Sequence, residues 1–249
     1  MEVHHHPDLH HRRKKFKEYL LEFVMIFLAV SLGFIAENVR EGIGDREKER
    51  HYVESLVNNL KDDTASFAST IAENVQKADS LKELELLSRK SLKDTAVRKA
   101  LYHYVSWASH FSLFKSNDAT MMQLKNSDGF RYIRRDHVAD SIANYDNEVK
   151  IIYSSEDLYI KASQEAVGAL DEMIDFTVSR DSTYMKSGGR WNPGVMPPLL
   201  STDPQKIHVM YNKIDLDWGF TQNYIQNMRE RLPTAIRLIA FLKEKYDLE

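Results

Sequence analysis

Histidines and carboxylic acids are the residues of this sequence whose spacing suggests chemistry. His103 and His110 lie seven positions apart, so on a helix they share one face. Imidazole nitrogens and carboxylate oxygens bind transition metals, and together with Asp136, His137 and Asp140 they would form a metal site if the fold brought them together. The spacing alone does not require that meeting, so we expect ordinary surface or core histidines.

Two pairs of acids have the composition of general acid–base sites. Asp62 and Asp63 are adjacent, and one residue separates Asp215 from Asp217. Base catalysis requires a pocket and a shifted pKa, which spacing alone does not supply. We therefore expect both pairs to be solvated helix caps or faces.

The signatures of common enzyme classes are absent from the sequence. It contains no Walker phosphate loop, no G-x-S-x-G turn, no H-E-x-x-H zinc motif and no glycine-rich dinucleotide turn. The chain has no cysteine, which excludes disulfides and thiol catalysis. The net charge of −3 offers no basic field for nucleic acid. We predict no catalytic residue, cofactor, metal or nucleic-acid partner.

An apolar run near the N-terminus predicts a membrane anchor. Residues 23–36 carry no charge, and a helix over residues 16–39, at ~1.5 Å per residue, is long enough to cross a ~30 Å hydrocarbon core. The residues that follow, 37–40, are Glu-Asn-Val-Arg, which is a poor cleavage site for a signal peptidase. We therefore predict an uncleaved, single-pass signal anchor in contact with lipid, preceded by a basic, histidine-rich tail over residues 1–15.

One face of the predicted anchor differs from the rest of its surface. At 100° per residue, small and polar side chains fall into one stripe, opposite bulky apolar residues such as Val24 and Phe27. A stripe of small residues permits close approach of a second helix, and an acid at membrane depth usually faces a partner or a wet cavity. The stripe is the predicted transmembrane interface, with a second copy or another protein, and comprises Glu22, Ile26, Ala29, Gly33 and Ala36. The alternative is that Glu22 lies in the headgroup region and pairs with nearby lysines.

The basic residues that flank the anchor indicate its orientation. Five lysines and arginines precede the span within residues 12–17, and four follow it between residues 40 and 50. The first group abuts the span, so the positive-inside rule favours a cytoplasmic N-terminus. This predicts a bacterial inner-membrane protein with a periplasmic C-terminal domain.

Residues 40–249 predict a helical soluble domain. Apolar residues recur at three- and four-residue steps over long stretches, which is typical of amphipathic helices in a bundle. Two glycines at 42 and 44 suggest a hinge after the span, residues 130–133 are the only strand candidate, and Pro233 is expected to kink or split the last helix. The predicted fold class is all-α, with one N-terminal transmembrane helix followed by a long-helix bundle.

An irregular loop over residues 181–204 interrupts the helical pattern. It holds four of the six prolines and three of the nine glycines. Long loops without regular structure are commonly functional, and Trp and Arg are enriched at binding hot spots. The candidate partner-binding residues are Arg190, Trp191, Met196, Leu199 and Leu200. The alternative is that these side chains only cover the core of the bundle.

Three stretches resemble a family of bacterial membrane proteins common in Bacteroidetes, domain of unknown function number 6090. They are the anchor with its flanks (residues 15–22, 37–38 and 60–63), the segment 117–133 with Tyr145, and the C-terminal residues 235–245. The sequence departs from the family pattern after the span, where it has Glu-Asn-Val-Arg-Glu in place of Asn-Asn-Trp-Asn-Glu. The resemblance implies a single-span topology and a helical domain, and it supplies no catalytic residues.

Together these features favour a membrane-anchored, non-enzymatic interaction or accessory subunit with an extracytoplasmic helical domain. Two alternatives remain open from the sequence. One is a ligand-sensing bundle that signals through a membrane partner. The other is a membrane-anchored hydrolase with an unrecognised site.

Overall fold

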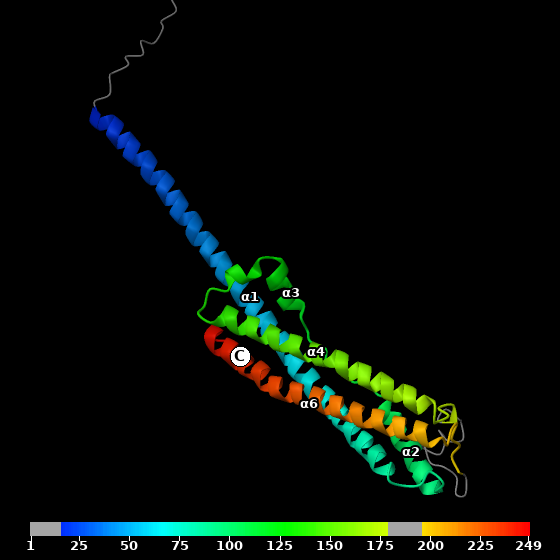
Figure 1. Cartoon of the computed structure of the whole chain (residues 1–249). Helices are drawn as coiled ribbons and strands as arrows, with labels where there is room; N and C mark the ends of the chain where they lie inside the picture. Colours follow the sequence, from blue (N-terminus) through cyan, green and yellow to red (C-terminus); the bar gives the residue numbers. More distant parts are fainter. Residues whose placement is uncertain (1–15, 179–195) are drawn as a thin grey trace, which may run out of the picture. The chain divides into compact units, whose positions relative to one another are not determined.

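The computed structural model describes residues 16–178 and 196–249, and these form helices joined by short connections, with no strand in either range (Figure 1). The helices are α1 (Phe16–Leu87), α2 (Thr95–Ala108), α3 (Ala119–Asn126), the 3-10 turn η1 (Gly129–Tyr132), α4 (Val138–Asp171) and α6 (Pro204–Tyr246). The all-α prediction, with one long apolar N-terminal helix before a helical domain, is confirmed. The histidine-rich tail of residues 1–15 lies outside the described residues.

The contacts divide the chain into an N-terminal unit, Met1–His51, and a C-terminal unit, Tyr52–Glu249. The described part of the N-terminal unit is helical throughout and belongs to α1, whose most apolar 18-residue window has a mean hydropathy of 2.2. This segment is a candidate membrane span by length and composition. The expected hinge at residues 42–44 is helical, because both glycines lie within α1.

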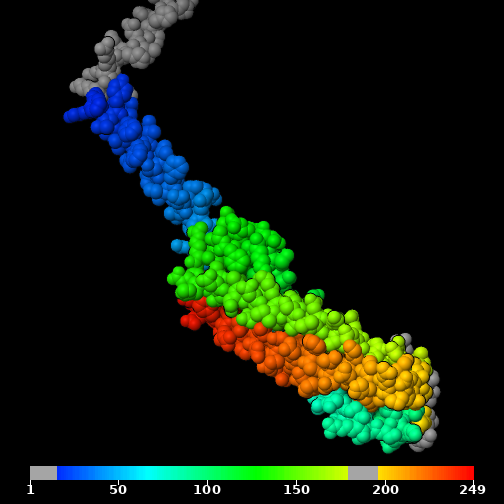
Figure 2. All heavy atoms as spheres, viewed as in Figure 1, coloured from blue at the N-terminus to red at the C-terminus, as the bar shows by residue number. Residues whose placement is uncertain are grey.

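The C-terminal unit is built on α1 from Tyr52 onwards, α4 and α6. Ion pairs join α4 to α6 at Glu148–Arg231, Glu165–Lys213 and Glu172–Lys206. The residue number rises on α4 as it falls on α6, so these two helices run antiparallel. Their outer surfaces, green to yellow and orange to red, lie side by side in Figure 2.

Helix α1 runs parallel to α4 in the C-terminal unit. Asp63 bonds Tyr145 and Lys77 bonds Ser163, so the partners on the two helices advance together. The side of α1 that faces this core follows one apolar stripe, with Val53, Leu56, Leu60 and Phe67 all at most 3 % exposed. A helix with such a stripe is stabilised mainly by burying it.

Two apolar clusters form the core of the C-terminal unit. The first draws on α1 up to Phe67, α4 up to Tyr159 and α6 from Tyr224 onwards. The second draws on α1 from Leu81, on α2, on α4 from Leu170 and on α6 up to Ile214. On each of the three long helices, the residues between the two clusters include buried polar side chains.

Several element boundaries differ from the sequence-based expectations. The strand candidate at 130–133 is wrong, because residues 129–132 form the turn η1. Helix α6 is continuous through Pro233, so the expected split is absent. Helix α2 ends at Ala108, and residues 110–118 form an irregular strap.

Candidate functional site

The strongest candidate for a functional centre is a layer of buried polar residues between the two apolar clusters. It consists of Lys77 on α1, Ser163 on α4, and Asp217 and Thr221 on α6, and we call it the polar layer. All four residues are 0 % exposed. Lysine and aspartate are almost never buried completely without a partner, so their contacts decide what this layer does.

The hydrogen bonds of the polar layer converge on Ser163. The Lys77 ammonium donates to Ser163 Oγ at 2.6 Å, and the Ser163 hydroxyl donates in turn to Asp217 Oδ1 at 2.5 Å. Lys77 Nζ also lies 3.4 Å from the same carboxylate oxygen. Thr221 donates to Asp217 Oδ1 at 3.3 Å, while Asp217 Oδ2 has no hydrogen-bond partner.

Burial shifts the two charged groups of this layer in opposite directions. It lowers the pKa of Lys77, and the nearby Asp217 carboxylate opposes that shift. It also raises the pKa of Asp217, and Lys77 with the two hydroxyl groups opposes that shift. Each partner therefore offsets part of the desolvation cost of the other's charge.

Aromatic rings enclose the ammonium group of Lys77. Its Nζ lies 4.6 Å from the Tyr159 ring centroid and 5.1 Å from that of Phe111. Both distances are within the range of a cation–π interaction. The Tyr159 ring stacks on Tyr224 with centroids 4.8 Å apart, and burial raises the pKa of both phenols.

A lysine next to a serine is also the arrangement of a Ser–Lys nucleophile pair, in which a neutral lysine takes the serine proton. The geometry here assigns the protons differently, because Lys77 donates to Ser163 and the serine proton is directed to Asp217. The side chains are also closed to solvent. The polar layer therefore has the properties of a structural ion pair rather than of a hydrolase site.

A second polar centre fixes the strap of residues 110–118 to α1. Asp63 is 1 % exposed. Its carboxylate accepts from Tyr145 OH at 2.6 Å, Ser116 Oγ at 2.8 Å and the Asn117 backbone at 2.6 Å. The start of α3 depends on the same side of α1, since Asn59 accepts from the Thr120 backbone at 3.1 Å. Asp118, at the N-cap position of α3, makes no side-chain cap bond, so Asn59 of α1 supplies the capping instead.

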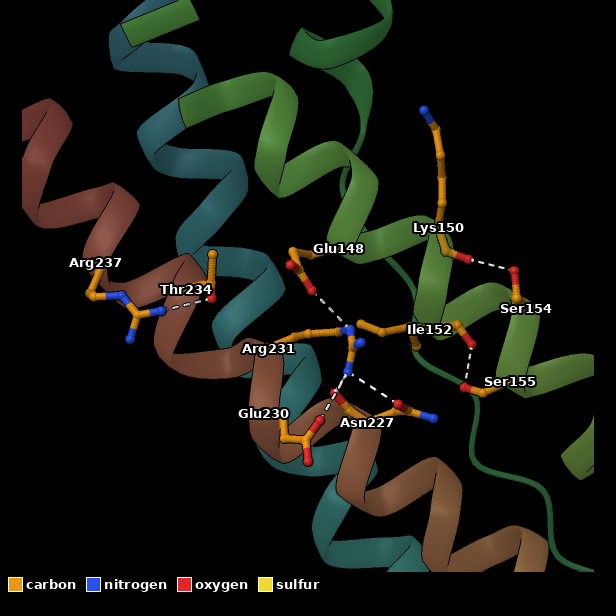
Figure 3. A network of polar contacts seen from close by, with 10 residues as sticks. All are labelled: Glu148, Lys150, Ile152, Ser154, Ser155, Asn227, Glu230, Arg231, Thr234 and Arg237. Carbon is orange, nitrogen blue, oxygen red and sulfur yellow. Dashed lines mark hydrogen bonds and ion pairs between the residues drawn. The ribbon is translucent and has the colours of Figure 1, made fainter. Parts of the chain in front are cut away.

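Arg231 forms a third polar cluster, where α6 meets α4 (Figure 3). Its side chain is 13 % exposed and lies 3.1 Å from Glu148 on α4. It also donates to the backbone and side-chain oxygens of Asn227 at 2.9 and 3.1 Å, and Glu230 lies 3.6 Å away. This cluster joins two helices and contains no nucleophile or histidine.

Each acid pair departs from the sequence-based expectation at one residue. One member of each acid pair, Asp63 and Asp217, is buried, so the expectation that both pairs are solvated is wrong for these two. No group of three or more His, Cys, Asp or Glu in residues 16–178 and 196–249 is arranged to hold a metal ion. His110 instead pairs with Glu73 at 3.1 Å on the surface.

The residues of the predicted transmembrane interface all lie in the N-terminal unit on α1. Every member of the stripe is exposed: Glu22, Ile26, Ala29, Gly33 and Ala36. A Cβ added at Gly33 meets no atom within 4 Å. The surface is therefore open to a partner helix, and the interface stays a prediction.

The candidate partner-binding loop is described only from residue 196 onwards, and Arg190 and Trp191 lie outside the described residues. Leu199 is half-buried against the second apolar cluster. Met196 is 41 % and Leu200 61 % exposed. The backbone is held by Tyr102 OH, which donates to the Pro198 carbonyl at 2.9 Å. This segment therefore both covers the core and leaves two apolar side chains at the surface.

Lys77, Ser163 and Thr221 are residues of the polar layer that the sequence analysis did not identify. The sequence does mark two members of the layer. Lys77 and Asp217 occupy positions in the buried stripes of α1 and α6 where apolar residues are expected. Comparison of the chain with protein-family models, with curated proteins and with solved structures gives no match.

Proposed function

We propose that this protein is a single-pass, membrane-anchored accessory subunit that acts by binding another membrane protein. One observation carries the proposal: the most apolar 18-residue window of α1 has a mean hydropathy of 2.2, and none of it is buried. Leaving a large apolar side chain in water rather than burying it costs about 1.5–3 kcal/mol. Hydrocarbon or a partner helix around this segment removes that cost.

The transmembrane stripe supports a partner within the membrane. Ala29 and Gly33 form a small-xxx-small pair, and helices associate closely through such pairs because their backbones can approach. Glu22 is an acid at the edge of the same stripe. A carboxylate at this depth favours a partner that supplies a polar or basic group.

The C-terminal unit supports a binding role rather than a catalytic one. Its fully buried charged pair, Lys77 and Asp217, is closed to solvent and is contacted by neighbouring side chains. Catalytic groups need contact with substrate, so this pair favours a structural role over the alternative of a membrane-anchored hydrolase.

The proposed location is a bacterial inner membrane, with the N-terminus in the cytoplasm and the C-terminal unit in the periplasm. The basic cluster of residues 12–17 directly before the span supports this orientation. Under this topology the exposed Met196 and Leu200 are available to a periplasmic partner.

The first test is purification of the full chain from native membranes in mild detergent, with the mass of the complex and its other components determined. We expect the chain to stay in the membrane pellet after carbonate extraction and to purify with another membrane protein in fixed stoichiometry. Release by carbonate would refute the anchor, and a monomer without a stoichiometric partner would refute the accessory role.

A matched pair of variants tests the interface itself. Gly33→Leu places a large side chain in the stripe, whereas Val24→Leu adds one methylene to the opposite surface of the helix. We expect Gly33→Leu to dissociate the complex and Val24→Leu to leave it intact. Equal association of both variants with the partner would show that the stripe is not the contact surface.

A further inference from the structure

A cavity of about 190 Å³ lies between α1, α4 and the strap that leads into α3. It is large enough for roughly six water molecules at ~30 Å³ each, or for one small organic molecule. One part of its wall is apolar and buried, formed by Leu60, Met121 and Val149. The rest is polar, so the cavity has the mixed lining of a small-molecule site.

The ionisable lining of this cavity is predominantly negative. Asp63, Asp118 and Asp146 contribute carboxylates, and Lys150 contributes the one ammonium group among the lining residues. Lys150 is already paired with Asp146 at 2.8 Å, and Lys125 pairs with the same carboxylate at 2.6 Å. The charge of Asp63 is therefore not balanced by the cations of the lining.

Among the three carboxylates of this lining, Asp63 is the buried one, and it has no cationic partner within the described parts of the chain. Its carboxylate accepts three hydrogen bonds, all from uncharged donors: Tyr145 OH, Ser116 Oγ and the Asn117 backbone. A carboxylate has about four acceptor positions. Two of the bonds go to Oδ2 and one to Oδ1, which leaves Oδ1 able to accept one more.

We propose that this cavity binds a small primary alkylammonium ion. The ammonium group donates to Asp63 Oδ1 and balances its charge, because a buried carboxylate gains most from a cationic donor. The side-chain oxygen of Asn59, which accepts one bond from the Thr120 backbone, has capacity for a second. The short alkyl chain lies against Leu60, Met121 and Val149.

The geometry disfavours other classes of small ligand. An anion meets the carboxylates of Asp63 and Asp118, so electrostatic repulsion opposes its entry. A neutral alcohol fills the apolar part but leaves the charge of Asp63 unbalanced. All residues that line this cavity belong to the C-terminal unit, so binding there does not depend on a membrane partner.

Calorimetric titration of the full chain in nonionic detergent with n-butylammonium chloride tests this proposal. Potassium chloride at equal ionic strength controls for salt, and 1-butanol controls for the apolar chain. We expect saturable binding of one n-butylammonium per chain and no saturable binding of 1-butanol. Absence of saturation up to about 50 mM, well above the millimolar affinity expected of so few atoms, would overturn the proposal.

Two variants locate the site without removing the structural bonds of Asp63. Val149→Phe fills the apolar part of the cavity and should abolish binding. Asp118→Asn removes a charge from the exposed rim and should weaken binding about two- to fivefold, as expected for a partly screened charge. Asp157→Asn, an exposed acid on α4 outside the lining, is the matched control and should bind like the wild type.

Circular dichroism spectra confirm that each variant is folded before titration. If Val149→Phe does not fold, Asp118→Asn against Asp157→Asn decides the question. Binding that survives a folded Val149→Phe, or that Asp118→Asn and Asp157→Asn affect equally, would overturn the assignment to this cavity.

Discussion

Replacing Lys77 by methionine tests whether the polar layer is a buried ion pair. Methionine keeps most of the length of the apolar stem but removes the ammonium group, which lies 3.4 Å from Asp217 and donates to Ser163. Asp217 then lies at 0 % exposure without a cation. A buried carboxylate in that position takes up a proton instead of remaining charged.

The size of the effect follows from the cost of that proton. An aspartate in the unfolded chain has an ordinary pKa of 3.8, so protonating Asp217 at about pH 7 costs roughly 4 kcal/mol at 1.36 kcal/mol per pKa unit. We therefore expect Lys77→Met to lower the free energy of unfolding by about 4 kcal/mol, within the ~3–5 kcal/mol typical of breaking a buried pair. Lys61→Met, an exposed lysine on the same helix, should change it by no more than ~0.5 kcal/mol.

The loss should also depend on pH in a definite direction. A carboxyl group whose folded pKa is raised contributes full stability below its unfolded pKa, and this contribution is lost as pH rises toward the folded pKa. Burial already raises the pKa of Asp217, and removing Lys77 raises it further. The penalty of Lys77→Met should thus shrink to roughly 2 kcal/mol at about pH 5.

Urea unfolding of the full chain in nonionic detergent, followed by circular dichroism, measures these differences. The double variant Lys77→Met with Asp217→Leu removes both charges and should recover most of the loss, because an apolar replacement of a buried pair is often neutral or stabilising. A penalty below about 1 kcal/mol for the single variant, or one that is equal at both pH values, would refute the buried pair.

Three further variants probe other contacts by the same unfolding assay. Tyr145→Phe removes one of three donors to Asp63 and should cost about 1.5–3 kcal/mol; a cost near zero would show that the bond is dispensable. Gly129→Ala should cost about 1–3 kcal/mol, because its Cβ would lie 2.9 Å from the Leu124 backbone; unchanged stability would refute that close approach. Asp203→Ala removes the N-cap of α6 and should cost about 1 kcal/mol; an unaffected unfolding midpoint would contradict the cap.

The helical elements could be predicted because their signals are local. Apolar residues at three- and four-residue steps over residues 40–249 predict long amphipathic helices, and α1, α4 and α6 carry this pattern. The exceptions have physical causes. Helix α6 accommodates Pro233 without ending, because packing against α4 and α1 outweighs the loss of one backbone bond.

The polar layer could not be predicted as a unit, because its members come from three helices. Lys77 and Asp217 are 140 positions apart in the sequence, and no periodicity measures which side chains meet across helices. The sequence does indicate that single polar residues of α1 are buried. The buried stripe of α1 passes from Phe67 through Asn74 and Lys77 to Leu81, so polar residues lie where the three- and four-residue pattern places core residues.

The polar layer also favours a single register of α6 against α1. Apolar stripes tolerate a slip of α6 by one turn, because another apolar side chain then fills the same space. The polar layer does not, because a slip of three or four residues brings Ile214, Phe220, Thr221 or Lys213 to the place of Asp217. Each of these leaves the ammonium of Lys77 without a carboxylate, and Lys213 adds a like charge. A buried polar pair used in this way specifies register at some expense in stability. The double apolar variant should therefore retain helix content and stability while its amide exchange in the middle of α6 becomes faster, whereas unchanged exchange would assign register to the apolar packing alone.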